Sequence, residues 1–145
     1  MAEPVARGPA RPVSIVRHPI YSMLLPVPIV CFLGALITDL TYANSSGNLL
    51  YVDFSSWLIA AGLVFGGIAG VVLLIDAIRR AASWVAFGLL LAAWIVELIN
   101  SFVHARDGWT AVVPLGLILS VIGALLILIC GWVGHLRFDA EWRRA

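Results

Sequence analysis

The stretch Ser56–Ile75 reads SWLIAAGLVFGGIAGVVLLI and contains no charged residue. An α-helix needs roughly 20 consecutive apolar residues to cross a hydrocarbon core about 30 Å thick. This stretch is long enough to do so, and the chain contains three further runs of the same kind. The four expected spans are Ile20–Tyr42, Ser56–Ile78, Ala82–Val103 and Ala111–Val133. The sequence therefore predicts an integral membrane protein.

The composition excludes a small soluble domain. Of the 145 residues, 62% are hydrophobic and 12% are charged, and the mean hydropathy is +1.03. A soluble domain carries roughly 25% charged residues, and a chain of this size has too high a surface-to-volume ratio to bury so many apolar side chains. We expect the lipid bilayer as its surroundings, a second copy or a larger membrane complex as its partner, and no nucleic acid.

The arginines are distributed asymmetrically along the chain. All nine basic residues are arginines, and one side of the expected membrane holds Arg7, Arg11, Arg17, Arg79, Arg80, Arg137, Arg143 and Arg144. Arg106 alone lies in a loop on the other side. Short arginine-rich segments stay in the cytoplasm. We therefore expect a multi-pass protein of the bacterial inner membrane with both termini in the cytoplasm.

The chain divides into one domain and two tails. Residues 1–17 are rich in proline, which favours a flexible, extended segment. Residues 18–138 hold the four spans, and residues 139–145 form a short C-terminal tail. The connections between the spans are short, so consecutive helices should be antiparallel neighbours. We predict an all-α membrane protein, an up-down-up-down bundle of four transmembrane helices.

The expected loops and bends can be placed on the sequence. The polar segment Ala43–Ser55 would join the first and second spans on the outer side, and His104–Gly108 would join the third and fourth. Arg79–Ala81 would form the turn between the second and third spans. Pro26 and Pro28 would bend the first helix near its cytoplasmic end.

Small residues predict a close helix contact. Gly62, Gly66 and Gly70 are spaced by four residues, which places them on one face of the second span. Such a face lets another helix backbone approach closely. The fourth span has a similar stripe that includes Ser120. We expect a contact between the second and fourth spans, and a homodimer through the glycine face is the alternative.

Ionisable groups within the spans are candidates for function, because each costs several kcal/mol unless it finds a partner or water. Glu97 is the deepest, and Asn100 follows three residues later on the same helix face. Asp39 lies at a similar depth near the outer end of the first span. Glu97 could be protonated and hold helices together by hydrogen bonds, or it could exchange protons with the outer side. We expect Asp76, near the inner end of the second span, to pair with an arginine or with His18.

Two of the three histidines suggest a cofactor. His18 and His135 fall at matching depth on the cytoplasmic side, whereas His104 falls on the other side. A b-type haem bound between helices needs two imidazoles at matching depth, so His18 and His135 are candidate haem ligands. The alternative is that both make contacts at the ends of helices. No C-x-x-C or H-E-x-x-H spacing predicts a metal site.

Two motifs at the ends of the helical region resemble those of a known family. Arg17–Ile29 reads RHPIYSMLLPVPI and Gly131–Leu136 reads GWVGHL. With Asp39, Asp76 and Asn100, these motifs resemble the DUF2231 family of predicted bacterial membrane proteins over residues 17–138. The resemblance implies a four-helix integral membrane fold. The function of that family is not established, but some relatives are joined to a Rieske-type iron–sulfur domain, which implies electron transfer near a quinone pool.

Three functions are compatible with these observations. The first is a structural or accessory role in a larger membrane complex, through helix packing. The second is an electron-transfer subunit that binds haem b through His18 and His135. The third is a small-solute or ion permease that uses Asp39 and Glu97. The sequence contains no nucleotide-binding glycine loop and no nucleophile elbow, so we do not expect an enzyme.

Overall fold

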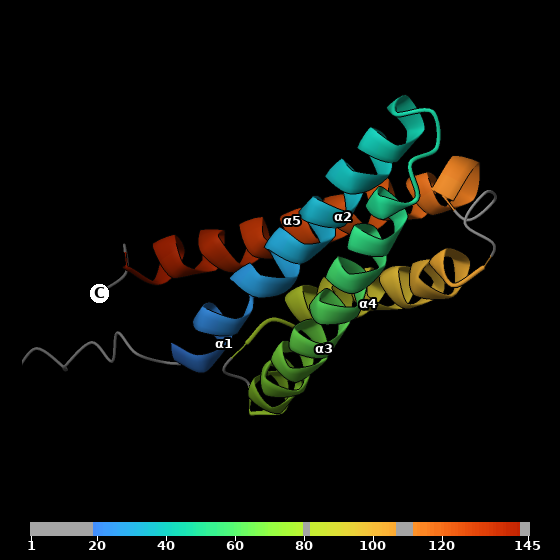
Figure 1. Cartoon of the computed structure of the whole chain (residues 1–145). Helices are drawn as coiled ribbons and strands as arrows, with labels where there is room; N and C mark the ends of the chain where they lie inside the picture. The colour runs from blue at the N-terminus through green and yellow to red at the C-terminus, as the bar shows by residue number, and fades with distance from the viewer. Residues whose placement is uncertain (1–18, 80–81, 107–111, 143–145) are drawn as a thin grey trace, which may run out of the picture.

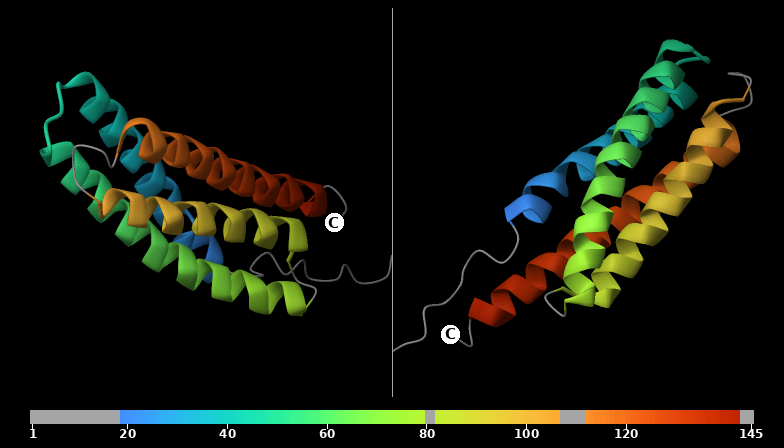
Figure 2. Two further views of the ribbon diagram at one scale, coloured as in Figure 1. Left: turned by 90° about the vertical axis from the view of Figure 1, so that its right-hand side faces the viewer. Right: turned by 90° about the horizontal axis from the view of Figure 1, so that it is seen from below.

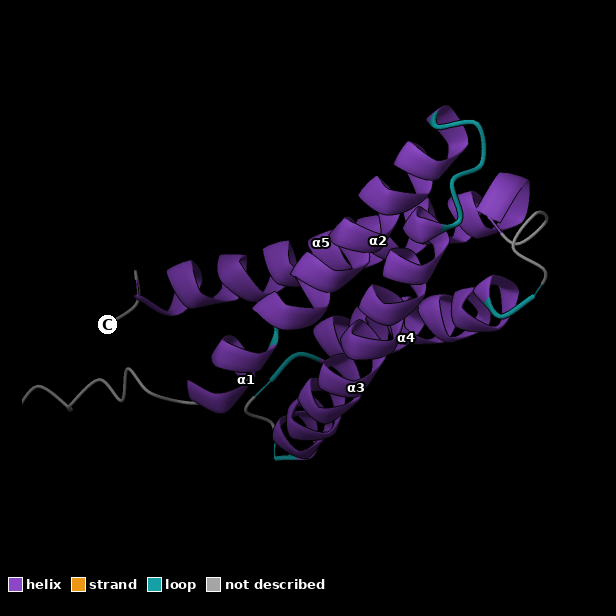
Figure 3. Cartoon of the chain, viewed as in Figure 1, coloured by secondary structure: helices purple, strands orange, loops and turns teal. Residues whose placement is uncertain are grey.

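Helices make up nearly all of the chain that a computed structural model describes, which is residues 19–79, 82–106 and 112–142. They are α1 (Pro19–Leu24), α2 (Pro26–Asn44), α3 (Leu50–Ile78), α4 (Trp84–His104), the π-helical turn η1 (Val112–Gly116) and α5 (Leu117–Trp142), shown in Figure 1. Figure 3 shows that short loops and turns link the helices and that the described residues contain no strand.

Four helical stretches are long and apolar enough to cross a membrane. They are Ile20–Asn44, Leu50–Ile78, Trp84–His104 and Val112–Gly134. Their outward faces expose large apolar side chains such as Val30, Val64, Ile95 and Leu125, as suits helices in contact with lipid tails. The predicted number of spans and the predicted all-helical fold are therefore confirmed.

The four spans pack antiparallel around a common core. α3 lies between α2 and α4, and α5 lies between α4 and α2; the two views in Figure 2 show this order. The second and fourth spans, α3 and α5, thus lie diagonally opposite each other. The contact that we predicted between them is wrong, because each packs mainly against α2 and α4 instead.

The glycine face of α3 is used inside the bundle, against α2 and α4. A Cβ atom on Gly62 would lie 2.3 Å from the Phe32 ring of α2. Gly66 lies against Pro28 of α2 and Trp94 of α4, and the Trp94 indole N–H donates a 2.9 Å hydrogen bond to the Leu63 carbonyl. The small residues therefore bring two neighbouring helices close to α3.

Prolines interrupt two of the spans. α1 ends at Leu24 and α2 begins at Pro26, close to where the bend is predicted, although the Leu25 N–H still bonds to the Tyr21 carbonyl at 2.9 Å. In η1, Val113 has extended dihedral angles (φ −110°, ψ 126°). Pro114 follows it, and the ring of a proline disfavours the α conformation of the residue before it.

The connection between α2 and α3 is shorter than predicted. α3 begins at Leu50 rather than Ser56, so the connection after α2 is a tight turn in which Gly47 adopts a positive φ of 85°. The side chain of Asn48 accepts a 3.1 Å hydrogen bond from the Leu50 N–H, which satisfies one of the free donors at the helix start. His104 is the last residue of α4 and not part of a loop.

Two apolar layers fill the core. We call the end of the bundle with the α2–α3 turn the Ser45 end, and the end with the α3–α4 turn the Arg79 end. The larger layer lies toward the Arg79 end and contains Leu25, Phe32, Ala69, Leu73, Ala86, Leu90, Ala93, Ile127 and Cys130. A smaller layer of Tyr42, Val52 and Val112 lies at the Ser45 end. By their positions along the helices, polar side chains occupy the space between the two layers.

Candidate functional site

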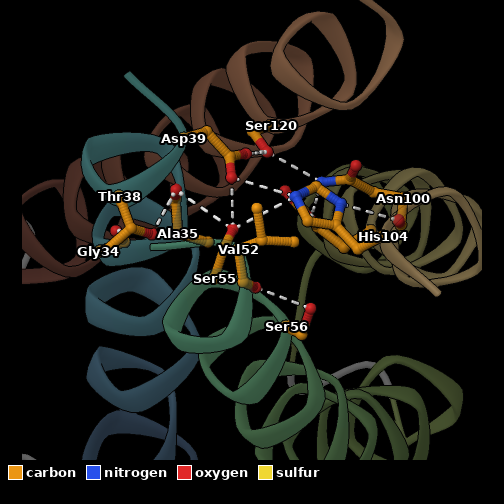
Figure 4. A network of polar contacts seen from close by, with 11 residues as sticks. Gly34, Ala35, Thr38, Asp39, Val52, Ser55, Ser56, Asn100, His104 and Ser120 are labelled. Atoms are coloured by element: carbon orange, nitrogen blue, oxygen red, sulfur yellow. Dashed lines mark hydrogen bonds and ion pairs between the residues drawn. The ribbon is translucent and has the colours of Figure 1, made fainter. Parts of the chain in front are cut away.

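Asp39 lies at the centre of a buried polar cluster to which every span contributes. Its Oδ1 atom accepts a 2.5 Å hydrogen bond from the Ser55 hydroxyl of α3. Its Oδ2 atom accepts a 2.5 Å hydrogen bond from the Ser120 hydroxyl of α5. The Nε2 atom of His104, on α4, lies 3.0 Å from Oδ1. Figure 4 shows these side chains converging on Asp39 from the three other helices. Asp39 therefore connects the whole bundle.

The second ring nitrogen of His104 also faces an acceptor. Its Nδ1 atom lies 3.0 Å from the carbonyl oxygen of Asn100, one turn earlier in α4. A carbonyl oxygen can only accept, so Nδ1 carries a hydrogen. Nε2 lies 3.0 Å from Asp39 Oδ1 and 3.3 Å from the Ser55 hydroxyl. Because the Ser55 hydroxyl donates its hydrogen to Asp39, a hydrogen bond between Nε2 and Oδ1 needs a second hydrogen, on Nε2 or on Asp39. In both arrangements the Asp39–His104 pair holds one proton more than a neutral imidazole beside an ionised carboxylate.

A second carboxyl group is connected to Asp39 through two polar side chains. The Asn100 amide Nδ2 donates hydrogen bonds to Glu97 Oε2 at 3.0 Å and to the Ser120 hydroxyl at 2.8 Å. Ser120 in turn donates to Asp39. The hydrogen-bonded chain therefore runs from Glu97 through Asn100 and Ser120 to Asp39, and it links α4, α5 and α2.

Gly123 of α5 provides the space for the Glu97 carboxyl group. A Cβ atom on Gly123 would lie 2.0 Å from Glu97 Oε1 and 2.7 Å from its carboxyl carbon. Any larger residue at this position would have to displace the carboxyl group. The side chain of Glu97 thus lies directly against the backbone of α5.

Burial separates the cluster from solvent. The side chains of Asp39, Ser55, Glu97, Asn100 and Ser120 are fully buried, and His104 is almost so. Asp39 is five residues from the end of α2, which corresponds to about 8 Å along the helix axis. The cluster is therefore nearer to the Ser45 end than to the Arg79 end.

Two oxygen atoms of the cluster have no hydrogen-bond partner. They are Glu97 Oε1 and Asn100 Oδ1, and both are buried. Buried polar atoms are nearly always paired, so an unpaired one calls for an explanation such as a bound water or ion.

The structure brings some of the sequence candidates together and separates others. Asp39, Glu97 and Asn100 share the cluster. Asp76 is buried near the other end of α3, 21 positions after Ser55, or about 30 Å along the helix. His18 lies outside the described residues, and so does the side chain of His135, although its backbone belongs to α5.

Sequence reasoning assigned Ser120 only to a stripe of small residues, and it missed two members of the cluster altogether, Ser55 and His104. Both were expected in outer loops, because polar residues near the end of an apolar run look like a loop in hydropathy. A signal was nevertheless present for His104, which follows Asn100 by four residues and Glu97 by seven. This spacing places all three on one helix face. No comparable signal marked Ser55.

The fold and the cluster define a class of protein: a multi-pass membrane protein with four spans and an acid–imidazole cluster in its core. The family model described as "Predicted membrane protein (DUF2231)" matches residues 17–138. The chain belongs to this family. No curated protein and no solved structure matches it.

Proposed function

We propose that this chain is a small proton-responsive membrane protein, in which a proton shared by Asp39 and His104 controls the packing of the four helices. The observation that carries the proposal is the geometry of His104, whose two ring nitrogens both face acceptors at 3.0 Å. The proton is held where α2, α3, α4 and α5 meet, so its loss would change the contacts of every span.

The energetic cost of the pair supports a functional role. Neutral side chains such as serine and asparagine can join transmembrane helices by hydrogen bonds. An aspartate and a histidine inside the membrane are more expensive and mark a functional site by default. Losing the proton would leave an ionised Asp39 with Nε2 of a neutral His104 facing it. That arrangement loses a hydrogen bond and places a net charge in an apolar core.

The position of the cluster favours proton exchange on one side over transport. The core from the cluster to the Arg79 end is filled by the larger apolar layer. In this proposal Asp39 and Glu97, the two residues expected for a permease, act together on helix packing. The protein would then suit the structural or accessory role predicted from its sequence. The arginine distribution predicts that the Ser45 end faces outward, so the protein would respond to pH on the outer side.

Nothing in the described residues bears on haem binding, because the side chains of His18 and His135 lie outside them. The haem alternative stays a prediction that an absorption spectrum of the purified protein would test.

The test is the protonation state of the pair in the intact protein. The chain would be labelled with ¹⁵N-histidine and ¹³C-aspartate, reconstituted into lipid nanodiscs and studied by NMR spectroscopy over a range of pH. The His104→Gln variant identifies the His104 signals among the three histidines. We expect the folded protein to show either two protonated ring nitrogens or a protonated Asp39 carboxyl group. A neutral His104 beside an ionised Asp39 in the folded protein at every pH would contradict the proposal.

The free energy of unfolding should also depend on the proton that Asp39 and His104 share. Above about pH 6.5 a free histidine is mostly neutral, so folding takes up a proton, and the free energy of unfolding should fall as the pH rises. Glu97 is the other titratable side chain that interacts with the pair; α3 and α5 contribute the hydroxyls of Ser55 and Ser120. In Asp39→Asn the amide can donate to a neutral His104, so this part of the pH dependence should be lost. An unchanged pH profile in Asp39→Asn would argue against the shared proton.

A further inference from the structure

One carboxyl oxygen of Glu97 has no hydrogen-bond partner in the polar cluster. Oε2 accepts a hydrogen bond from Asn100, whereas Oε1 has no partner although the side chain is fully buried. The carboxyl group lies against the backbone of Gly123, inside the bundle. A fully buried carboxylate with an unpaired oxygen is costly, so a further group is needed to stabilise it.

The charges of the cluster point to the nature of that group. Asp39 and His104 with their shared proton are neutral together. Glu97 adds one negative charge when it is ionised, and the ion pair found at the cluster joins His104 to Asp39. Arg79 and Arg106, the arginines whose side chains the structure describes, are both exposed. When Glu97 is ionised, the described side chains of the buried cluster therefore lack one positive charge.

We propose that Glu97 binds one monovalent cation, either a proton or a sodium ion, at Oε1. The other unpaired oxygen, Asn100 Oδ1, belongs to the side chain whose Nδ2 donates to Glu97 Oε2, so it is a candidate for a second oxygen ligand. Oxygen atoms of carboxylate and amide groups are suitable ligands for a hard cation. The site goes beyond the proposed function, because it takes a second cation at a different carboxyl group.

The two sites are coupled through the hydrogen-bonded chain. Binding of a cation at Glu97 changes the electrostatic environment of Asp39 and His104, the titratable side chains that interact with Glu97. Asn100 and Ser120 lie between the two carboxyl groups. α3 contributes Ser55 to the cluster, which does not titrate. We expect each cation to weaken or strengthen the binding of the other, because interacting sites titrate as a coupled system.

The experiment compares thermal unfolding of the wild type and Glu97→Gln in nanodiscs. Each would be measured over a range of pH in sodium chloride and in choline chloride at equal ionic strength. A sodium site predicts a rise in the wild-type midpoint with sodium that weakens at low pH, because protons compete for Oε1. A proton site predicts stabilisation by low pH that is equal in both salts. Glu97→Gln should lose the sodium response and the part of the pH response that comes from Glu97, and Asp53→Asn at the exposed Asp53 is the control that should keep both.

Infrared spectroscopy of the wild type gives a measurement that does not depend on a variant folding. A carboxylic-acid C=O band that isotope-labelled glutamate assigns to Glu97 identifies the cation as a proton, even if it persists over the whole pH range. A carboxylate band that shifts with sodium identifies a sodium ion. An ionised Glu97 with no response to sodium overturns the proposal. Any pH response that remains in Glu97→Gln belongs to Asp39 and His104, so the two proposals can fail separately.

Discussion

At the scale of single residues, Ser120 shows how much depends on one hydroxyl group. It donates to Asp39 at 2.5 Å and accepts from Asn100 at 2.8 Å, so it joins the two halves of the cluster. Ser120→Ala leaves a buried oxygen and a buried amide hydrogen without partners. We expect the free energy of unfolding to fall by about 1–3 kcal/mol, measured by steric trapping or by SDS unfolding in mixed micelles.

A matched control is present in α3. The hydroxyl of Ser56 donates to the Val52 carbonyl of its own helix, at 2.8 Å, and this carbonyl already belongs to the helical hydrogen-bond pattern. Ser56→Ala removes the same oxygen atom from the protein but leaves no buried polar group unpaired. We expect little change in stability. Equal effects of the two substitutions would mean that the cluster does not stabilise the bundle.

The sequence predicted half of the cluster, and the reason is physical. Asp39, Glu97 and Asn100 are polar residues deep inside apolar runs, where lipid offers them no partner. Ser55 and His104 lie near the ends of their helices, where a polar residue can equally belong to a loop. Their role depends on Asp39, which lies on another helix, and hydropathy along one helix carries no information about that neighbour.

At the scale of helices, Gly62 determines how closely α2 and α3 approach. A Cβ atom there would lie 2.3 Å from the Phe32 ring and 3.1 Å from Cβ of Cys31. Gly62→Ala therefore displaces the Phe32 ring or forces the two helices apart, and we expect a loss of about 1–3 kcal/mol from overpacking. Steric trapping of the doubly labelled protein would measure it.

Gly88 of α4 is the control for this prediction. A Cβ atom on Gly88 would meet nothing within 4 Å, and alanine is a better helix former than glycine by up to about 1 kcal/mol. Gly88→Ala should leave stability unchanged or raise it slightly. Destabilisation of similar size in both variants would indicate an effect of the helix backbone instead of packing between α2 and α3.

The existence of the helices was easier to predict than which helices pack against each other. The length of an apolar run establishes that a span exists, and spacing by four residues establishes that Gly62, Gly66 and Gly70 share a face. Neither property selects the helix that the face meets. In a ring of four, α3 has two neighbours and one diagonal partner, and its glycines pack against the two neighbours, α2 and α4.

At the scale of the whole molecule, the core is layered along the bundle axis. The small apolar layer at the Ser45 end covers the polar cluster, and the larger layer separates it from the Arg79 end. Tyr42, Val52 and Val112 come from α2, α3 and η1, so a small shift of these segments would change access to Asp39. Access should therefore be controlled at the end of the bundle that we expect to face outward.

The orientation of the bundle gives the last prediction. Short arginine-rich segments stay in the cytoplasm, so the Arg79 end should be inside and the Ser45 end outside. Asn44 and Arg79 are both exposed, and each can be replaced singly by cysteine. In right-side-out spheroplasts, a membrane-impermeant maleimide should label Asn44→Cys directly, and Arg79→Cys after the membrane is permeabilised.

The native cysteines give this experiment a low background, because Cys31 and Cys130 are both buried within the bundle. The wild type should stay unlabelled under both conditions. The reverse pattern, with Arg79→Cys labelled in closed spheroplasts, would show that the protein has the opposite orientation in the membrane. The Asp39–His104 pair, which lies nearer the Ser45 end, would then respond to cytoplasmic pH. The result therefore determines which compartment the proposed proton site reports on.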